Sequence, residues 1–275
     1  MKIHIKNSNY YYDDTKLIGS GSFSNVYECY DDKYKYLVKI EKKETNLLKD
    51  EYNFHSLLKK NPEYHNFVPK LYGFYEDKYY NYLVLKKLGL SLDKVLKKIK
   101  YGLDTFSLNN IAQKTLKNIK FLHENKILHL DIKPENIVLS QDYKNVYLID
   151  FGLSKFFIKN GKHIPFREKI SPSGTLRYMS KYTNSYLQSS RRDDLISFGY
   201  VLLFLESKTL PWANLKIDKR NEKYEQVAKL KNTISPQELC SKTKINLLPY
   251  FEYCYQLKFD EKPDYEYLIK LFDKS

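Results

Sequence analysis

Long apolar stretches and cysteines are scarce in this chain of 275 residues. No run of about 18 apolar residues occurs, so the sequence predicts no transmembrane helix. The polar start, from Met1 to Tyr12, lacks the apolar core of a secretory signal. Cys29, Cys240 and Cys254 form no CxxC pair, which argues against a disulfide framework and a structural zinc site. We therefore expect an intracellular protein, in the cytoplasm or the nucleus, with no membrane partner.

Acidic residues are also in deficit, because 33 Asp and Glu stand against 47 Lys and Arg, a formal net charge of +14. Such a charge suits an acidic partner such as nucleic acid, a membrane surface or phosphorylated protein. The lysines are spread along the whole chain, as an A/T-biased genome would produce, and we favour this compositional explanation for most of them. Hydrophobic residues make up 42% of the chain, enough to order most of its length.

Two patterns of secondary structure divide the sequence. The first third contains short runs rich in Val, Ile, Tyr and Phe, which predict strands at Thr15–Ser20, Val26–Tyr30, Tyr36–Glu41, Leu71–Tyr75 and Tyr80–Leu85. Helical spacing predicts a helix at Thr45–Lys59. After residue 88 the predicted helices are Leu108–Glu124 with Ser107 as its N-cap, the apolar Asp194–Leu205, Arg220–Leu230, Asn246–Tyr255 and Tyr265–Phe272. This order predicts an α+β architecture of two lobes, at about 1–87 and 88–275.

A glycine-containing turn precedes a lysine in an apolar strand. Glycines in the run Ile18–Val26 would let backbone N–H groups approach phosphate oxygens, although such a run alone is more often a plain hairpin. Lys39 would place its ammonium group on the α- and β-phosphates of a nucleotide, although a strand lysine ordinarily faces solvent. Glu51, twelve residues later on the predicted helix, is the expected partner of Lys39, and Asp50 is the alternative.

The strongest local motif is His129–Asn136, which reads HLDIKPEN. Asp131 can orient a substrate hydroxyl and accept its proton, and Lys133 can steady a transferring phosphoryl group. Asn136 can hold a metal ion through its amide oxygen. Fourteen residues later Asp150 opens a DFG motif after an apolar strand, where its carboxylate can ligate Mg²⁺. Either motif occurs by chance in other proteins, but their order behind a glycine turn and a strand lysine is specific.

These motifs resemble those of the eukaryotic protein kinases, and later segments narrow the resemblance to the casein kinase 1 family. The segments that carry it are His163–Glu168, Gly174–Tyr178, Ser190–Leu195, Gly199–Leu202, Leu210–Trp212, Lys223–Glu225 and Phe259–Tyr265. Leu88–Leu92 resembles the hinge exit of the family, and the likeness runs in order from about Leu17 to the end. It implies a two-lobed protein kinase domain over residues 1–275, with ATP and Mg²⁺, or Mn²⁺, as cofactors.

The resemblance assigns roles to the matching residues. The implied nucleotide-binding residues are Ile18, Gly19, Ser20, Gly21, Ser22, Val26, Val38, Lys39, Glu51, Leu85, Lys86, Leu88 and Leu139. Leu85 would be the gatekeeper, and backbone groups from Lys86 to Leu88 would bind adenine. The residues that would sandwich the adenine ring are Ile18, Val26, Val38 and Leu139. Asp131 and Lys133 would be catalytic, Asn136 and Asp150 would hold the metal, and Asp194 would fasten the catalytic-loop backbone.

Arg177 and Lys223 match the basic site with which the family recognises substrates that already carry phosphate or acidic residues. Lys181, Lys219 and Arg220 are further candidates, although solvated surface charge explains Lys219 and Arg220 equally well. We therefore expect acidic or phosphorylated protein substrates, with nucleic acid as a secondary partner. The sequence does not define an oligomeric state.

Some residues depart from the general kinase pattern. Leu130 stands where most kinases have an arginine that often contacts a phosphate on the activation segment. We therefore predict activity that is independent of phosphorylation at Ser171, Ser173 and Thr175. Vaccinia-related kinases also lack this arginine and rank second as relatives. Met179–Lys181 replaces the usual Ala-Pro-Glu, which casein kinase 1 members lack as well.

Three functions of different classes fit the chain. The first is an active serine/threonine kinase, for which Lys133 at two residues after Asp131 speaks against tyrosine specificity. The second is a pseudokinase that acts as a scaffold, yet Lys39, Asp131, Asn136 and Asp150 are all present. The third is a basic nucleic-acid-binding module, for which no reader motif is found. The sequence ends shortly after the last predicted helix, so we expect no regulatory tail or lipidation signal. A compact kinase of this kind suits a viral or parasite member of the family.

Overall fold

The computed structural model describes residues 2–21 and 24–273. Two compact units make up the chain. The first unit contains Met1–Gly89 and Tyr147–Gly152, and the second contains Leu90–Val146 and Leu153–Ser275. The predicted α+β class is confirmed, because the first unit is built on a sheet and the second is mainly helical. Among the helices of the described residues, none has the length and apolar character that a membrane span requires.

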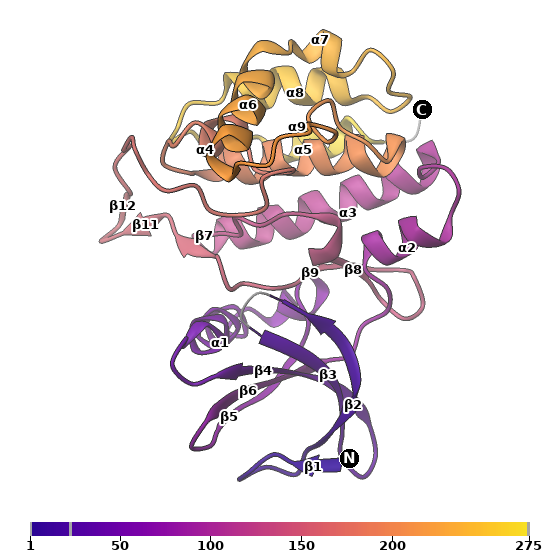
Figure 1. The fold of residues 1–275 in the computed structure, drawn as a ribbon, viewed down its shortest axis with the longest axis vertical. Coiled ribbons are helices and arrows are strands. Elements are labelled where there is room, and N and C mark those ends of the chain that lie inside the picture. The colour runs from indigo at the N-terminus through magenta and orange to yellow at the C-terminus, as the bar shows by residue number, and fades with distance from the viewer. Residues whose placement is uncertain (1, 22–23, 274–275) are drawn as a thin grey trace. The chain divides into compact units, whose positions relative to one another are not determined.

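The first unit contains a six-stranded antiparallel sheet in the order β1-β2-β3-β4-β6-β5 (Figure 1). Its strands are β1 (Lys2–His4), β2 (Tyr11–Ser20), β3 (Ser24–Tyr30), β4 (Lys35–Lys42), β5 (Leu71–Glu76) and β6 (Tyr80–Lys86). The five predicted strands are confirmed, with ends that differ by a few residues. β1 was not predicted, because a strand of three residues is too short to show alternation.

Aspartates close two of the hairpins of this sheet. Asp31 accepts hydrogen bonds from the N–H groups of Lys33 and Tyr34, at 2.8 and 2.7 Å. Asp77 accepts those of Tyr79 and Tyr80, both at 2.7 Å. A short carboxylate that binds the backbone of its own turn makes the reversal favourable.

The two faces of the sheet carry different residues, because successive side chains of a strand point to opposite sides. One face holds a buried cluster of Ile5, Cys29, Tyr36, Val38, Ile40, Tyr82 and Val84. The other holds Leu48, Leu71, Leu83 and Leu85. Lys39 lies on this second face, since it is the direct partner of Leu83 across β4 and β6. The second face is therefore the one that positions the site.

Helix α1 (Leu47–Leu58) packs on β4, β5 and β6. Its N-cap residue, Asn46, has left-handed backbone geometry (φ 54°) and makes no side-chain cap. Glu41 of β4 replaces it, because Glu41 Oε1 accepts the N–H of Leu48 at 2.7 Å and Oε2 accepts the Thr45 hydroxyl at 2.7 Å. A carboxylate at this end also suits the helix dipole. The start of α1 is thereby fixed to the strand that carries Lys39.

Helices form most of the second unit. They are α2 (Leu92–Lys98), α3 (Thr105–Glu124), α4 (Lys181–Asn184), α5 (Arg191–Ser207), α6 (Arg220–Thr233), α7 (Pro236–Leu239), α8 (Leu247–Gln256) and α9 (Tyr265–Lys270). Short elements are the strands β7 (Ile127–Leu128), β8 (Ile137–Leu139), β10 (Lys155–Phe156), β11 (Ile158–Lys159) and β12 (Lys162–His163) and the 3-10 turn η2 (Pro134–Asn136). The turn η1 (Pro62–Asn66) belongs to the first unit, and β9 (Val146–Leu148) begins in the second unit and ends in the first.

Helix α5 is the centre of the second unit. It packs against α3, α4 and α8, which explains its apolar sequence (Figure 1). The structure extends the predicted helix at both ends, to Arg191 and to Ser207. The earlier start is stabilised by Asp193, in the first turn, which accepts the N–H of Ser190 at 2.7 Å. The predicted N-cap of α3 was wrong, since Asp104 caps the helix and accepts the N–H of Ser107 at 2.9 Å.

Candidate active site

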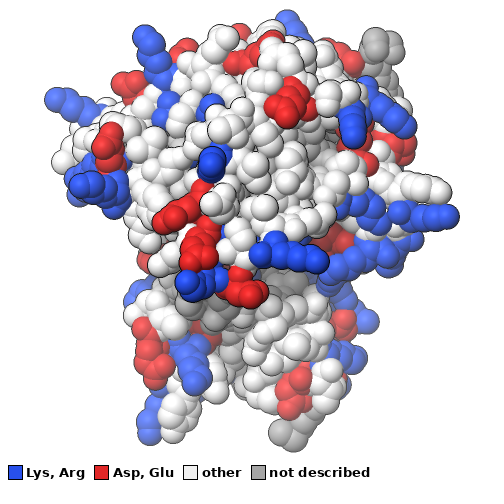
Figure 2. Space-filling view, turned by 45° about the horizontal axis from the view of Figure 1, so that its top comes forward, with Lys and Arg blue, Asp and Glu red and all other residues white. Residues whose placement is uncertain are grey.

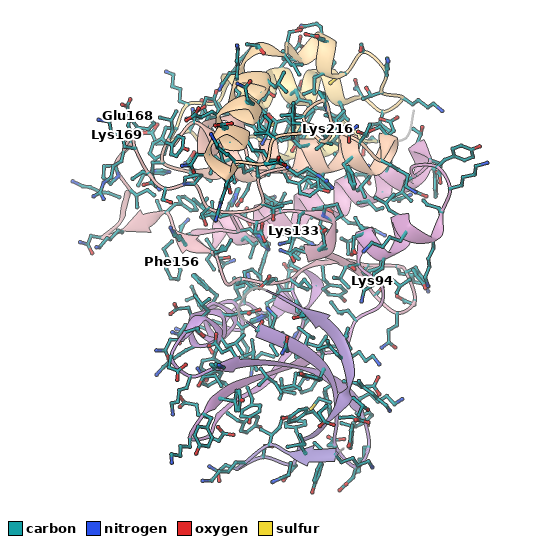
Figure 3. The ribbon with its side chains drawn as sticks, viewed as in Figure 1. Lys94, Lys133, Phe156, Glu168, Lys169 and Lys216 are labelled. Atoms are coloured by element: carbon teal, nitrogen blue, oxygen red, sulfur yellow. The ribbon has the colours of Figure 1, made fainter. Side chains whose placement is uncertain are left out.

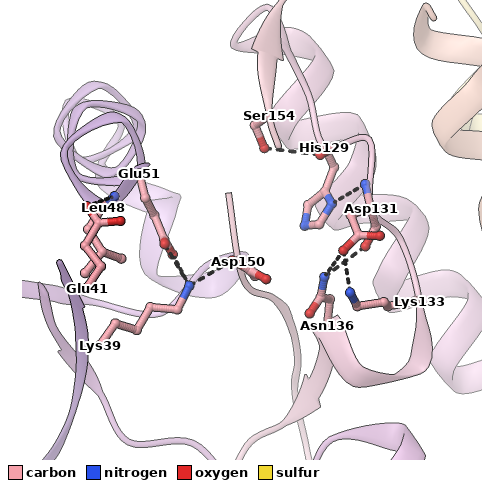
Figure 4. A network of polar contacts seen from close by, with 10 residues as sticks. All are labelled: Lys39, Glu41, Leu48, Glu51, His129, Asp131, Lys133, Asn136, Asp150 and Ser154. Atoms are coloured by element: carbon pink, nitrogen blue, oxygen red, sulfur yellow. Dashed lines mark hydrogen bonds and ion pairs between the residues drawn. The ribbon is translucent and has the colours of Figure 1, made fainter. Parts of the chain in front are cut away.

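Lys39 is the centre of a buried ionic cluster in the first unit (Figure 4). Its Nζ lies 2.9 and 2.7 Å from the two carboxylate oxygens of Glu51 and 2.9 Å from Asp150 Oδ1. Lys39 and Glu51 are 7% and 1% exposed, whereas the side chain of Asp150 is 42% exposed. The expected pair between Lys39 and Glu51 is present, and the alternative partner, Asp50, is exposed.

Two carboxylates keep this lysine charged. Burial acts to lower the pKa of Lys39, but the charges of Asp150 and Glu51 outweigh it and raise this pKa above its usual value. An ammonium group with two anionic partners in the interior stays protonated at neutral pH. The cluster thus keeps a charged ammonium group at Lys39, with Asp150 as its exposed member.

The glycine turn between β2 and β3 is closed at its base. The N–H of Gly21 donates to the backbone carbonyl oxygen of Ser24 at 2.8 Å, and the Ser20 hydroxyl donates to Asn25 Oδ1 at 2.8 Å. A Cβ at Gly19 would meet no atom within 4 Å, so this position is open on its outer side. The predicted residue Ser22 lies outside the described residues.

Val38 does not share the face of Lys39, which argues against its predicted contact with adenine. Val38 is fully buried in the cluster on the opposite face of the sheet, with 0% exposure. Leu37 is the neighbour that points to the side of Lys39, and it pairs directly with Leu85 of β6. Val26 pairs directly with Lys39 and therefore also lies on this side.

Residues near the end of β6 include the expected adenine contacts. Leu85 is 3% exposed and packs with Leu83 and Leu71 on the face of Lys39. The N–H of Lys86 donates to the backbone oxygen of Lys70 at 2.8 Å, so this group is already bonded to the residue before β5. Leu88 is half-buried after the strand. In the second unit Leu139 is half-buried on β8, and Ile18 is half-buried on β2 of the first unit.

The second unit carries the catalytic-loop motif, and Asp131 lies at its centre (Figure 4). Asp131 Oδ1 accepts the N–H and the hydroxyl of Thr175, at 3.0 and 2.8 Å. Oδ2 accepts Lys133 Nζ and, at 3.2 Å, the Asn136 amide. Asn136 also donates to the backbone oxygen of Asp131 at 2.9 Å. The loop thus brings Asp131, Lys133 and Asn136 together, and Figure 3 labels Lys133 on it.

Asp194 of α5 holds the backbone of this loop. Its oxygens accept the N–H groups of His129 at 2.7 Å and Leu130 at 2.8 Å, and it is 1% exposed. Burial acts to raise the pKa of Asp194, but hydrogen bonds and charge from His123, and the N–H of His129, lower it below its usual value. His123 Nε2 lies 3.0 Å from Asp194 Oδ2, and its Nδ1 lies 2.6 Å from the Tyr265 hydroxyl. His123 and Tyr265 are supporting residues that the sequence did not reveal.

Two of these positions have left-handed backbone geometry, with φ 65° at Leu130 and φ 69° at Asp150. Aspartate tolerates this region, whereas leucine rarely adopts it. The two N–H bonds to Asp194 fix Leu130 in this conformation. Strain of this kind persists only where surrounding contacts impose it, as at functional sites.

Oxygen groups that suit Mg²⁺ are present in each unit. The first unit offers the half-exposed carboxylate of Asp150. The second offers the amide oxygen of Asn136, whose amide nitrogen is already bonded to Asp131. Groups of three or more His, Cys, Asp or Glu that could hold a metal ion by themselves do not occur within residues 2–21 and 24–273. Magnesium bound with a nucleotide needs fewer protein ligands, because phosphates supply the others.

The predicted anion-binding residues differ in their surroundings. Arg177 is exposed and its guanidinium lies 5.5 Å from the ring centre of Phe204. Lys223 on α6 is half-buried, and Arg220 is exposed. On the face that Figure 2 shows, Lys and Arg side chains occur at many places with Asp and Glu among them.

Lys181 and Lys219 already have partners of their own. Lys219 forms an ion pair with Glu222 at 3.0 Å. Lys181 Nζ lies 3.8 Å from the ring centre of Tyr255. Burial, and to a smaller extent the charge of Arg192, lower the pKa of Lys181. Arg177 is therefore the stronger candidate for an anion contact.

Comparison with known families identifies the class of protein. Residues 12–261 match the protein kinase domain, so the chain belongs to the protein kinase family. The chain is also similar to casein kinase I homolog 2 of Schizosaccharomyces pombe, with 34% identity over 268 residues. This alignment covers 94% of the chain and 61% of the yeast protein, so the chain spans less than two thirds of that relative. The predicted protein kinase fold and casein kinase 1 resemblance are confirmed.

Proposed function

We propose that the chain is an ATP-dependent serine/threonine protein kinase, which transfers the γ-phosphoryl group of ATP to a protein hydroxyl. The observation that carries this proposal is the carboxylate of Asp131, which Thr175, Lys133 and Asn136 hold in a fixed position. A general base must be held within hydrogen-bond reach of the hydroxyl that it serves. No predicted catalytic residue is missing from the chain, so a pseudokinase is not favoured.

In the proposed reaction, the substrate hydroxyl oxygen attacks the γ-phosphorus and its proton passes to Asp131. The bond from the γ-phosphorus to its bridging oxygen breaks, and ADP leaves with that oxygen. Lys133, which contacts both Asp131 and the Thr175 hydroxyl, would balance charge that develops on the transferred group. Lysine at this position also favours serine and threonine over tyrosine.

Most of the proposed nucleotide contacts belong to the first unit. Lys39, which Glu51 and Asp150 keep charged, would hold the α- and β-phosphates. Its hydrogen bond to Asp150 would weaken when the phosphates bind. Bound Mg²⁺, or Mn²⁺, would neutralise phosphate charge, with Asp150 and Asn136 as its protein ligands. The remaining contacts are Gly19, Ser20, Gly21 and Ser22 for phosphate and Ile18, Val26, Leu37, Leu85, Lys86, Leu88 and Leu139 for adenine. Leu37 takes the place of Val38 in this set.

Substrates with acidic or phosphorylated residues fit the chain best. Arg177 presents a permanent positive charge to solvent, and a guanidinium group binds phosphate or carboxylate in a bidentate manner. Lys223 would be its partner. Nucleic acid stays a secondary partner, suggested only by the net charge of +14.

The experiment is transfer of labelled phosphate from Mg·ATP to casein and to a phosphoprimed acidic peptide. Wild type should label serine or threonine, Asp131→Asn should not, and Asp142→Asn serves as an exposed control on another loop. Transfer to a primed peptide should exceed transfer to its unprimed form. A folded wild type that binds ATP yet transfers no phosphate would overturn the proposal and favour the pseudokinase.

A further inference from the structure

Helix α6 carries a lysine that lies inside the second unit. Lys231 is 1% exposed, and its Nζ donates hydrogen bonds to the backbone oxygens of Leu176 at 2.7 Å and Met179 at 2.8 Å. The ring centres of Tyr200 and Trp212 lie 5.5 and 5.1 Å from this nitrogen. Lysine is almost never buried to this degree without a compensating interaction, so its surroundings must stabilise it.

Within the part of the chain that the structure describes, these surroundings contain no opposite charge. Burial lowers the pKa of Lys231 well below its usual range, and no carboxylate among residues 2–21 and 24–273 contributes to counter that shift. Two backbone oxygens and two aromatic ring faces take the place of a carboxylate. The lysine is therefore tied to the geometry of the backbone that it contacts.

The backbone in question is a tight turn, Thr175–Met179. The N–H groups of its last two residues, Tyr178 and Met179, both donate to the backbone carbonyl oxygen of Thr175, at 2.9 Å each. The oxygen of Arg177, in the middle of the turn, accepts a hydrogen bond from Trp212 Nε1 at 2.8 Å. Side chains from outside the turn thus hold three of its carbonyl groups, two through Lys231 and one through Trp212.

The other end of the same turn reaches Asp131. Thr175 donates two hydrogen bonds to Asp131 Oδ1, at 3.0 and 2.8 Å. Gly174, directly before it, has φ 103°, and a Cβ there would lie 2.5 Å from the Leu130 oxygen. The turn is therefore in close contact with the catalytic loop, and the exposed side chain of Arg177 extends from its middle.

We propose that Lys231 is a positioning residue that fixes this turn for substrate binding. By holding two carbonyl groups of the turn, it sets the place of Arg177 for an acidic or phosphorylated substrate and keeps Thr175 on Asp131. A turn that is ordered before the substrate arrives loses less entropy on binding, so its fixation lowers the KM for the substrate. Lys231 acts only through the turn, and this inference rests on the proposed function.

Lys231→Met is the most direct variant, because methionine keeps a long flexible side chain against the two rings and removes both donors. Lys229→Met changes the same residue type on the same helix at an exposed position and is the matched control. For each folded variant, kcat and KM are measured with a primed peptide, its unprimed form and ATP. Lys231→Met should raise the KM for the primed peptide about tenfold and leave the KM for ATP unchanged. Lys229→Met should behave as wild type.

A residue with a purely structural role would give a different result. Loss of folded protein lowers kcat on both peptides by the same factor and leaves every KM unchanged, and this outcome would overturn the inference. If Lys231→Met does not fold, Trp212→Phe removes the hydrogen bond to the Arg177 backbone oxygen and keeps an aromatic ring, although a smaller one, at this position. It should raise the KM for the primed peptide in the same direction, by about twofold to threefold. An unchanged KM in Trp212→Phe would count against the proposal.

Amide hydrogen exchange without substrate tests the turn independently of catalysis. The N–H groups of Tyr178 and Met179 should exchange at least about tenfold faster in Lys231→Met than in wild type. Equal exchange in both proteins would show that Lys231 does not hold the turn. If wild type transfers no phosphate but the exchange difference appears, the proposed function fails while the contact between Lys231 and the turn stands.

Discussion

His55, on α1, should make the stability of the protein depend on pH. Its side chain is 0% exposed, and neither ring nitrogen has a hydrogen-bond partner within the described residues. The ring lies edge-on to Phe151, with ring centres 5.2 Å apart. Burial, with a smaller effect of the positive charge of Lys39, lowers the pKa of His55 to about 3.

The size of the effect follows from the difference between the folded and unfolded states. In the unfolded chain the pKa of a histidine is about 6.5. Between this value and the folded pKa of about 3, the unfolded state binds a proton that the folded state does not, so stability decreases as the pH falls. From about pH 7 to about pH 5 the loss from this residue is about 2 kcal/mol, and by about pH 4 it is about 3 kcal/mol.

Urea unfolding of wild type and His55→Leu, near pH 7 and near pH 5, measures the contribution of His55 to the free energy of unfolding. Leucine fills a similar volume, and it removes two buried nitrogens that lack partners. His55→Leu should be more stable than wild type by about 1 kcal/mol near pH 7, with about 2 kcal/mol more near pH 5. His65→Leu, at an exposed position, should stay much closer to wild type in its pH dependence. A stability difference between wild type and His55→Leu that does not change with pH would refute the reasoning.

Further predictions concern the substrate, regulation and the nucleotide. Arg177→Ala should lower kcat/KM for a primed peptide by about tenfold and spare the unprimed peptide, and equal losses on both would contradict the anion site. Phosphatase treatment should leave activity unchanged, because Leu130 cannot bind a phosphate. Loss of activity would show that the enzyme depends on phosphorylation of its own chain. Leu37→Ala should raise the KM for ATP, whereas Val38→Ala should only lower the free energy of unfolding, by about 2 kcal/mol. If Val38→Ala raised the KM for ATP and Leu37→Ala did not, Val38 rather than Leu37 would be the residue that contacts ATP.

Alternation along β4 could have corrected one sequence prediction. The stretch Leu37–Ile40 reads as apolar on both sides of Lys39, which hides the two faces of the strand. A period of two places Leu37, and not Val38, on the side of Lys39. The structure confirms that period, with Val38 in the opposite cluster.

Helix ends and short elements were harder to predict for a different reason. Asp104 and Ser107 are both good N-cap residues, and only the observed start of α3 distinguishes them. The helices α2, α4 and α7 and the strand β1 are too short for their periodicity to stand out, since α2 has seven residues and β1 has three. Tertiary packing, rather than local preference, determines such elements.

Contacts that depend on packing were not accessible from the sequence. Lys39 and Glu51 could be paired because their spacing belongs to a known motif. Glu41 and Lys231 look like ordinary surface charges in a strand and in a polar helix, yet they are 2% and 1% exposed. Their roles emerge only from the backbone groups that they contact.

In the proposed mechanism Asp131 serves the chemical step, while the cluster at Lys39 binds the nucleotide. The most direct test compares Mg·ATP affinity, by calorimetry, with turnover of a primed peptide in Asp131→Asn. The variant should bind Mg·ATP with the affinity of wild type, and its kcat should fall by about 10²- to 10⁴-fold. Turnover close to that of wild type would contradict the assignment of Asp131, and with it the proposed mechanism.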